Sequence, residues 1–87
     1  MSYSINIKRS AQRSLARISQ LNQNRIVEAI KALEIEPRPV GCKKLSGREA
    51  WRIRAGDYRV IYEIQESKRV VIVVVVGHRS QVYKTKS

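Results

Sequence analysis

Five residues in the C-terminal half have side chains that could bind and cleave a phosphodiester: Arg52, Arg54, Arg59, Arg79 and Tyr83. They lie on or just after apolar runs that are typical of β-strands, where a buried cation would be very costly. Guanidinium groups form strong, often bidentate hydrogen bonds with phosphate oxygens. Several of them on rigid strands, with a tyrosine nearby, therefore predict a phosphate-binding and phosphate-cleaving surface.

The dipeptide Gly56-Asp57 separates two runs with alternating apolar residues, 51–55 and 58–64. Glycine at the first central position favours a two-residue type II′ hairpin. That turn would pair Arg54 with Arg59 and leave the opposite face as a core of Trp51, Ile53, Val60 and Tyr62. Like charges directly opposite each other destabilise a strand pair, so the pattern indicates that an anion sits between the two arginines.

The segment 70–76 is an almost unbroken β-branched run, which is typical of a central strand buried on both faces. Residues 66–68 read as the turn before it. Gly77 interrupts the run, and His78 and Arg79 follow where the strand ends. We expect the helices to cover one face of this strand and the arginines to occupy the other.

The N-terminal half must supply those helices. Alternation over 3–7 predicts a short strand, and a helix capped by Ser10 would then bury Ala11, Leu15 and Ile18. A second helix starting at Asn22 or Asn24 would bury Ile26, Ile30 and Leu33, and Pro37 and Pro39 would end it. Four cations lie off this apolar stripe and are assigned to a solvated face: Arg13, Arg17, Arg25 and Lys31.

The expected fold is a single α+β domain over residues 1–87, with element order β-α-α-β-β-β-β. A short N-terminal strand and a helical hairpin would pack on one face of a small, twisted, mainly antiparallel sheet.

Composition limits the partners of this domain. Eighteen Lys plus Arg against seven Asp plus Glu give a net charge of +11, which favours a polyanion or an acidic protein. Cys42 is the one cysteine and His78 the one histidine, so an intrachain disulfide or a typical zinc site lacks residues. The N-terminus lacks a long apolar stretch, and segment 70–76 is too short to span a bilayer. We expect a soluble cytoplasmic protein with no metal, cofactor or membrane partner.

The segment 44–64, which contains Gly-Asp-Tyr-Arg-Val-Ile-Tyr, and the later Gly-His-Arg and Val-Tyr resemble the RelE branch of the RelE/ParE toxin superfamily. The resemblance covers nearly the whole chain. It implies a ribosome-dependent endoribonuclease that cuts mRNA in the ribosomal A site by metal-free attack of a ribose 2′-OH on the adjacent phosphate. It also implies a neutralising antitoxin of the RelB type.

The resemblance implies roles for individual residues. Arg59 would stabilise the charge on phosphorus, Arg79 would lie near the leaving oxygen, and Tyr83 would orient the nucleotide and share in proton transfer. The family often has lysine where this chain has Arg52 and Arg54, and a guanidinium is a poor base. The general base is therefore unassigned, and five residues are expected to bind substrate: Arg52, Arg54, Lys43, Lys44 and His78.

Two alternatives remain. A ParE-like protein would bind DNA gyrase without cleaving nucleic acid, and a similar fold cannot distinguish it from a nuclease. A non-catalytic basic module would bind RNA through its phosphates alone. The concentration of arginines and Tyr83 on one expected surface favours cleavage.

Overall fold

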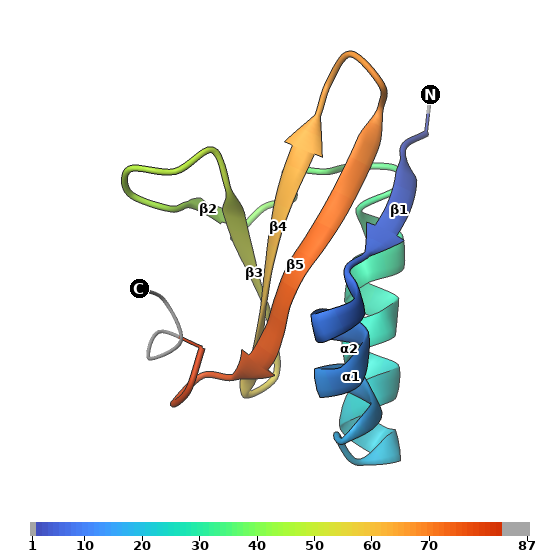
Figure 1. The fold of residues 1–87 in the computed structure, drawn as a ribbon, viewed down its shortest axis with the longest axis vertical. Helices are drawn as coiled ribbons and strands as arrows, with labels where there is room; N and C mark the ends of the chain where they lie inside the picture. The colour runs from blue at the N-terminus through green and yellow to red at the C-terminus, as the bar shows by residue number, and fades with distance from the viewer. Residues whose placement is uncertain (1, 83–87) are drawn as a thin grey trace.

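The computed structural model describes residues 2–82, so Tyr83 lies outside the described part of the chain. The elements follow in the order β1 (Ser4–Ile7), α1 (Arg9–Ala16), α2 (Gln20–Ala32), β2 (Lys43–Lys44), β3 (Trp51–Ala55), β4 (Tyr58–Gln65) and β5 (Val70–His78) (Figure 1). This order confirms the predicted β-α-α-β-β-β-β pattern. Neither of these two helices is long and apolar enough to cross a membrane.

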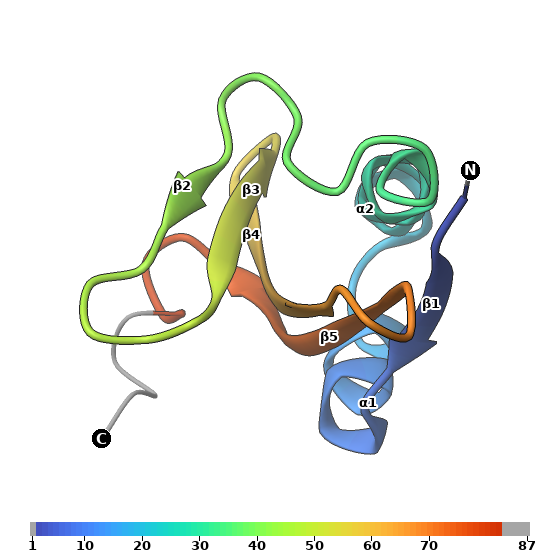
Figure 2. The same cartoon turned by 90° about the horizontal axis from the view of Figure 1, so that it is seen from above.

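The five strands form one sheet in the order β1-β5-β4-β3-β2. β1 pairs in parallel with β5, and the other three pairs are antiparallel, so the sheet is mixed and mainly antiparallel. Seen from above, the sheet twists strongly between β1 and β2 (Figure 2). β5 lies between two strands, as its apolar run predicts.

The main core lies between the helices and one face of the sheet. α1 contributes Ala11, and α2 contributes Ile26 and Ile30, all of them buried. The sheet contributes a row of apolar side chains from its three longest strands: Ile53, Val60, Tyr62, Val71, Val73 and Val76. The core face predicted for the β3–β4 hairpin is confirmed, with Trp51 only partly buried at its margin.

A bulge in β5 changes the alternation of its side chains between the two faces of the sheet. Ile61 pairs with Val75 whereas Tyr62 pairs with Val73, so Val74 is an extra residue on β5. At such a bulge two residues face one on the partner strand. Val74 and Val75 thereby pack against a second, smaller cluster of Ala50, Ile61 and Val82. The face expected to carry only arginines therefore also holds a small apolar core.

The helices begin earlier than predicted. α1 starts at Arg9 rather than at a Ser10 cap, because Lys8 N–H still donates to the Val73 carbonyl (2.9 Å) and the chain turns at once. α2 follows Ser19, and neither Asn22 nor Asn24 caps it. The Asn22 side-chain amide donates instead to Ser19 Oγ (3.1 Å).

One carboxylate joins three segments at the end of the sheet far from the β3–β4 turn. Glu66, in the β4–β5 connection, accepts hydrogen bonds from Tyr3 Oη (2.8 Å) and Arg38 Nη2 (2.5 Å). The Arg38 guanidinium also lies over the Trp51 ring, 5.0 Å from its centroid. Hydrogen bonds from Tyr3 and Arg38 lower the pKa of Glu66 below its usual value of 4.5.

This pKa shift predicts a loss of stability in acid. A carboxyl whose pKa is lower in the folded state adds stability above its unfolded-state pKa and loses it as the pH falls through its folded-state pKa. We therefore expect Glu66→Gln to be less stable than the wild type at neutral pH, with a difference that narrows in acid. Urea unfolding from about pH 7 down to about pH 3 measures it.

Glu28→Gln is the matched control, because Glu28 lies on α2 and makes no ion pair within residues 2–82. It should keep the wild-type pH dependence. A Glu66→Gln deficit that stays constant across the whole range would contradict the proposed origin.

Candidate nucleic-acid interface

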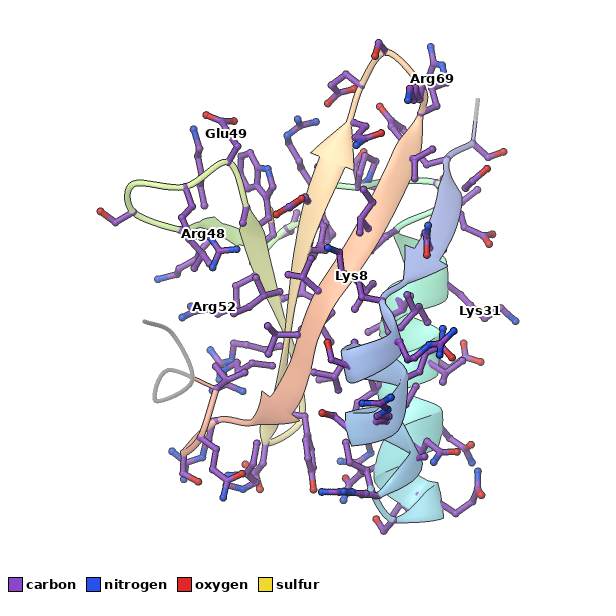
Figure 3. The ribbon with its side chains drawn as sticks, in the orientation of Figure 1. Lys8, Lys31, Arg48, Glu49, Arg52 and Arg69 are labelled. Carbon is purple, nitrogen blue, oxygen red and sulfur yellow. The ribbon has the colours of Figure 1, made fainter. Side chains whose placement is uncertain are left out.

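The β3–β4 hairpin has the register that its sequence predicts. Ala55 pairs with Tyr58, and Arg54 pairs with Arg59. Gly56 has φ +63°, whereas Asp57 does not have a positive φ, as a type II′ turn requires. By strand alternation Arg52, Arg54 and Arg59 share the face away from the helices, and Figure 3 shows Arg52 projecting on that side.

Two carbonyl oxygens hold the Arg59 guanidinium against the turn. Nη1 donates to the Tyr58 carbonyl (3.0 Å) and to the Gly56 carbonyl (3.3 Å). Carbonyl oxygens orient a guanidinium without neutralising its charge. Arg59 is thus fixed in place with its charge still able to attract an anion.

Arg79 reaches the same turn from the end of β5. Its backbone N–H donates to the Asp57 carbonyl (2.8 Å), and its Nε lies 3.7 Å from Asp57 Oδ1. The Arg79 guanidinium thus has an acidic neighbour in Asp57. Both side chains are more than half exposed, and a surface ion pair of this kind contributes about 0–1 kcal/mol, so a phosphate can compete for Arg79.

Sequence reasoning missed Arg25. A Cβ added to Gly56 would lie 3.4 Å from Arg25 Nη1, so α2 brings another guanidinium to the turn. Arg25 is exposed and off the apolar stripe of α2, which is why its spacing suggested a solvated face. Only the packing of α2 against β3 and β4 reveals its position.

Gly56→Ala should disturb this arrangement in two ways. An alanine at φ +63° is strained by about 1–2 kcal/mol, and its methyl group would lie in contact with the Arg25 guanidinium. We expect a lower urea midpoint and a shifted ¹⁵N NMR signal for Arg25 Nε.

Gly47→Ala is the control for the backbone, because Gly47 has φ +71° and no atom within 4 Å of the added Cβ. It should lose stability without moving the Arg25 signal. An unmoved Arg25 signal in Gly56→Ala would contradict the contact.

The two lysines and the histidine that were expected to bind substrate lie in different places on the sheet. Lys43 pairs with Arg52 across β2 and β3 and so lies on the arginine face. Lys44 pairs with Trp51, and its Nζ lies 3.2 Å from Glu49 Oε2.

His78 lies on the other side of the sheet from the arginines. Its pairing partner in β4 is Tyr58, which belongs to the helix-covered face. The two rings meet edge to face, with centroids 5.5 Å apart and planes at 84°. The structure therefore does not bring His78 together with Arg59.

Positive charge exceeds negative charge around the Gly56-Asp57 turn. Within residues 2–82 the ion pairs are Arg38–Glu66, Lys44–Glu49, Arg48–Glu63 and Arg79–Asp57, and none includes Arg25, Arg54 or Arg59. Three guanidinium groups near one turn, with Asp57 as the nearby acid, favour an anionic ligand. No three His, Cys, Asp or Glu side chains of this part of the chain form a group that could hold a metal ion.

Comparison with known proteins identifies the family of the chain. Residues 5–83 match the family model described as the ParE toxin of the type II toxin–antitoxin system parDE. The chain belongs to the RelE/ParE toxin superfamily. These proteins are toxins of type II toxin–antitoxin systems, so the superfamily predicted from the hairpin motif is confirmed.

RelE proteins are prominent among the relatives in this superfamily. A curated protein of Methanocaldococcus jannaschii, provisionally named toxin RelE1, is 27% identical, covering 97% of this chain and 98% of its own. A chain of the archaeal RelE–RelB complex from Pyrococcus horikoshii is 28% identical with a TM-score of 0.82, and the match covers 94% of this chain and 100% of that chain. A chain of the Mycobacterium tuberculosis toxin–antitoxin complex RelBE2 is 26% identical with a TM-score of 0.81, covering 91% and 100%.

Proposed function

We propose that this toxin is a ribosome-dependent endoribonuclease that cuts mRNA in the ribosomal A site. The observation that carries the proposal is the gathering of Arg25, Arg54, Arg59 and Arg79 around the Gly56-Asp57 turn. A compact set of oriented guanidinium groups suits the extra negative charge of a phosphoryl transition state. The likeness to RelE proteins supports the same reading.

The reaction consumes no co-substrate besides the RNA. The ribose 2′-oxygen forms a bond to the adjacent phosphorus, and the bond from phosphorus to the 5′-oxygen breaks. The products are a 2′,3′-cyclic phosphate and a 5′-OH, and the proton lost by the 2′-OH is balanced by one gained at the 5′-oxygen.

In this proposal Arg59 stabilises charge on the nonbridging oxygens, and Arg79 leaves Asp57 to contact the phosphate near the leaving oxygen. Arg52, Arg54 and Lys43 bind the RNA backbone. Tyr83 orients the nucleotide, and its assignment rests on the resemblance because it lies outside the described residues. No side chain is assigned as the base, and a solvent or ribosomal group can accept the proton.

The same charge suits an antitoxin. The relatives from Pyrococcus horikoshii and Mycobacterium tuberculosis are complexes of toxin with antitoxin. We propose that a RelB-type partner with an acidic, partly disordered segment folds over the helical hairpin and sheet of this chain. It would block access to the ribosome in the cytoplasm.

A translation assay tests the nuclease proposal. Purified protein is added to a translating extract with a defined mRNA, and the RNA ends are mapped by primer extension. Cuts within the A-site codon that appear only with ribosomes are expected. Intact mRNA would overturn the proposal.

The second candidate is a gyrase-binding toxin without nuclease activity, which the ParE family model favours. It predicts intact mRNA together with inhibited DNA supercoiling by purified gyrase. Intact mRNA with working gyrase would instead indicate a non-catalytic basic RNA-binding module.

A further inference from the structure

A cavity lies on the helix side of the sheet, between α1 and the end of β5. Its volume is about 260 Å³. Ser14 and Arg17 line it from α1 and its C-terminal cap, and Tyr58, His78 and Gln81 line it from the sheet and the turn that follows. None of these five residues has a role in the proposed cleavage.

Contacts fix the orientation of the two rings, Tyr58 and His78, that form the aromatic wall of this cavity. The Tyr58 and His78 rings are held edge to face, and the backbone N–H of Ser80 donates to His78 Nδ1 (3.1 Å). An Nδ1 that accepts a hydrogen bond leaves the proton of a neutral imidazole on Nε2. His78 therefore has a fixed ring orientation and an Nε2–H that can donate to a ligand.

The cation beside this wall is Arg17. It is exposed, it makes no ion pair within residues 2–82, and α1 contains no acidic residue. Aromatic rings with an arginine nearby are the usual means by which proteins hold an unstacked base and its phosphate. Ser14 and Gln81 add a hydroxyl and an amide that can hydrogen-bond to a base edge.

We propose that this cavity binds one nucleobase of an RNA strand, with Arg17 on the adjoining phosphate. The inference rests on the proposed function, because it takes RNA as the ligand of the neighbouring arginines. His78 and Arg79 are adjacent in sequence, so a strand crossing the Gly56-Asp57 turn would pass from one site to the other. The cavity then holds a nucleotide of the same strand on the helix side of the turn, beyond the phosphate bound by the arginines.

Nucleotide binding tests the site without the ribosome. Adenosine 3′-monophosphate is titrated into protein labelled with ¹³C at histidine and tyrosine, and inorganic phosphate is titrated in parallel. We expect saturable shifts of the His78 and Tyr58 ring signals with the nucleotide only. Arg17→Ala should weaken nucleotide binding about tenfold, the value of one charge-assisted hydrogen bond.

Arg13→Ala is the matched control. It removes the same charge one helical turn away, from an exposed residue that does not line the cavity. Its nucleotide affinity should remain within about twofold of the wild type. Equal losses of nucleotide affinity in Arg17→Ala and Arg13→Ala would show that binding depends on net charge alone, and would overturn the proposed site.

Equal shifts with inorganic phosphate would show that the base is not recognised, and absent shifts would show that the cavity is not a nucleotide site. Either result overturns the inference while A-site cutting by the wild type leaves the proposed function standing. Nucleotide binding without any mRNA cutting would reject the nuclease and retain the cavity as an RNA-binding site.

Discussion

Arg59→Ala is expected to reduce A-site cleavage by about 10²–10³-fold, the usual loss when one preorganised donor to a developing oxyanion is removed. The two carbonyl contacts of Arg59 orient its guanidinium in advance, so the transition state gains a charge that needs no rearrangement. Primer extension with quantified band intensities measures the loss.

The fold should survive this change, because the Arg59 side chain lies on the face opposite the main core and makes no ion pair within residues 2–82. Arg13→Ala controls for the loss of one charge and should cut at nearly the wild-type rate. Arg59→Lys keeps the charge but loses the planar fork, so an intermediate rate is expected. Undiminished cutting by Arg59→Ala would remove this residue from the catalytic group.

Tyr62→Ala is expected to have the largest effect on stability, about 3–5 kcal/mol, as for other large aromatic residues removed from a core. Tyr62 is fully buried, and its hydroxyl donates to the Pro37 carbonyl at 2.6 Å. Burial raises the pKa of Tyr62, so the hydroxyl remains a protonated donor. The contact ties the segment after α2 to the centre of the sheet.

Tyr62→Phe separates the hydrogen bond from the packing. Tyr62→Phe should lower the free energy of unfolding by about 1–3 kcal/mol, because the Pro37 carbonyl loses its buried donor while the ring remains. Tyr3→Phe is the control at a partly exposed hydroxyl and should cost less. Urea unfolding of the three variants gives the ranking, and a neutral Tyr62→Phe would contradict the importance of the Pro37 contact.

Local rules were sufficient for the β3–β4 hairpin and for the helix faces. A two-residue loop at Gly56-Asp57 leaves one register, and the opposite faces of its strands differ clearly in polarity. The apolar stripe of α2 likewise predicted Ile26 and Ile30 in the core. These features depend on neighbours in sequence or on a single turn.

Features set by long-range packing were not predictable. Arg25 reaches Gly56 because α2 packs on β3 and β4, and nothing in its local spacing indicates that contact. The second cluster around Ile61 and Val82 depends on a bulge hidden within a uniform valine run. Helix starts also differed, because the end of β1 rather than a capping side chain determines where α1 begins.

The extra residue at Val74 shifts by one position the alternation of the β5 side chains that follow it. Before it, odd-numbered residues of β5 face the helices, and after it Val76 and His78 do. If β5 continued from Val73 without the bulge, Val76 would lie opposite Arg59, and a valine side chain would occupy the position where Gly77 now has Val82 at 3.4 Å from a would-be Cβ. The bulge, and not only the hydrophobicity of the valine run, thus decides which side chains each face of the sheet presents.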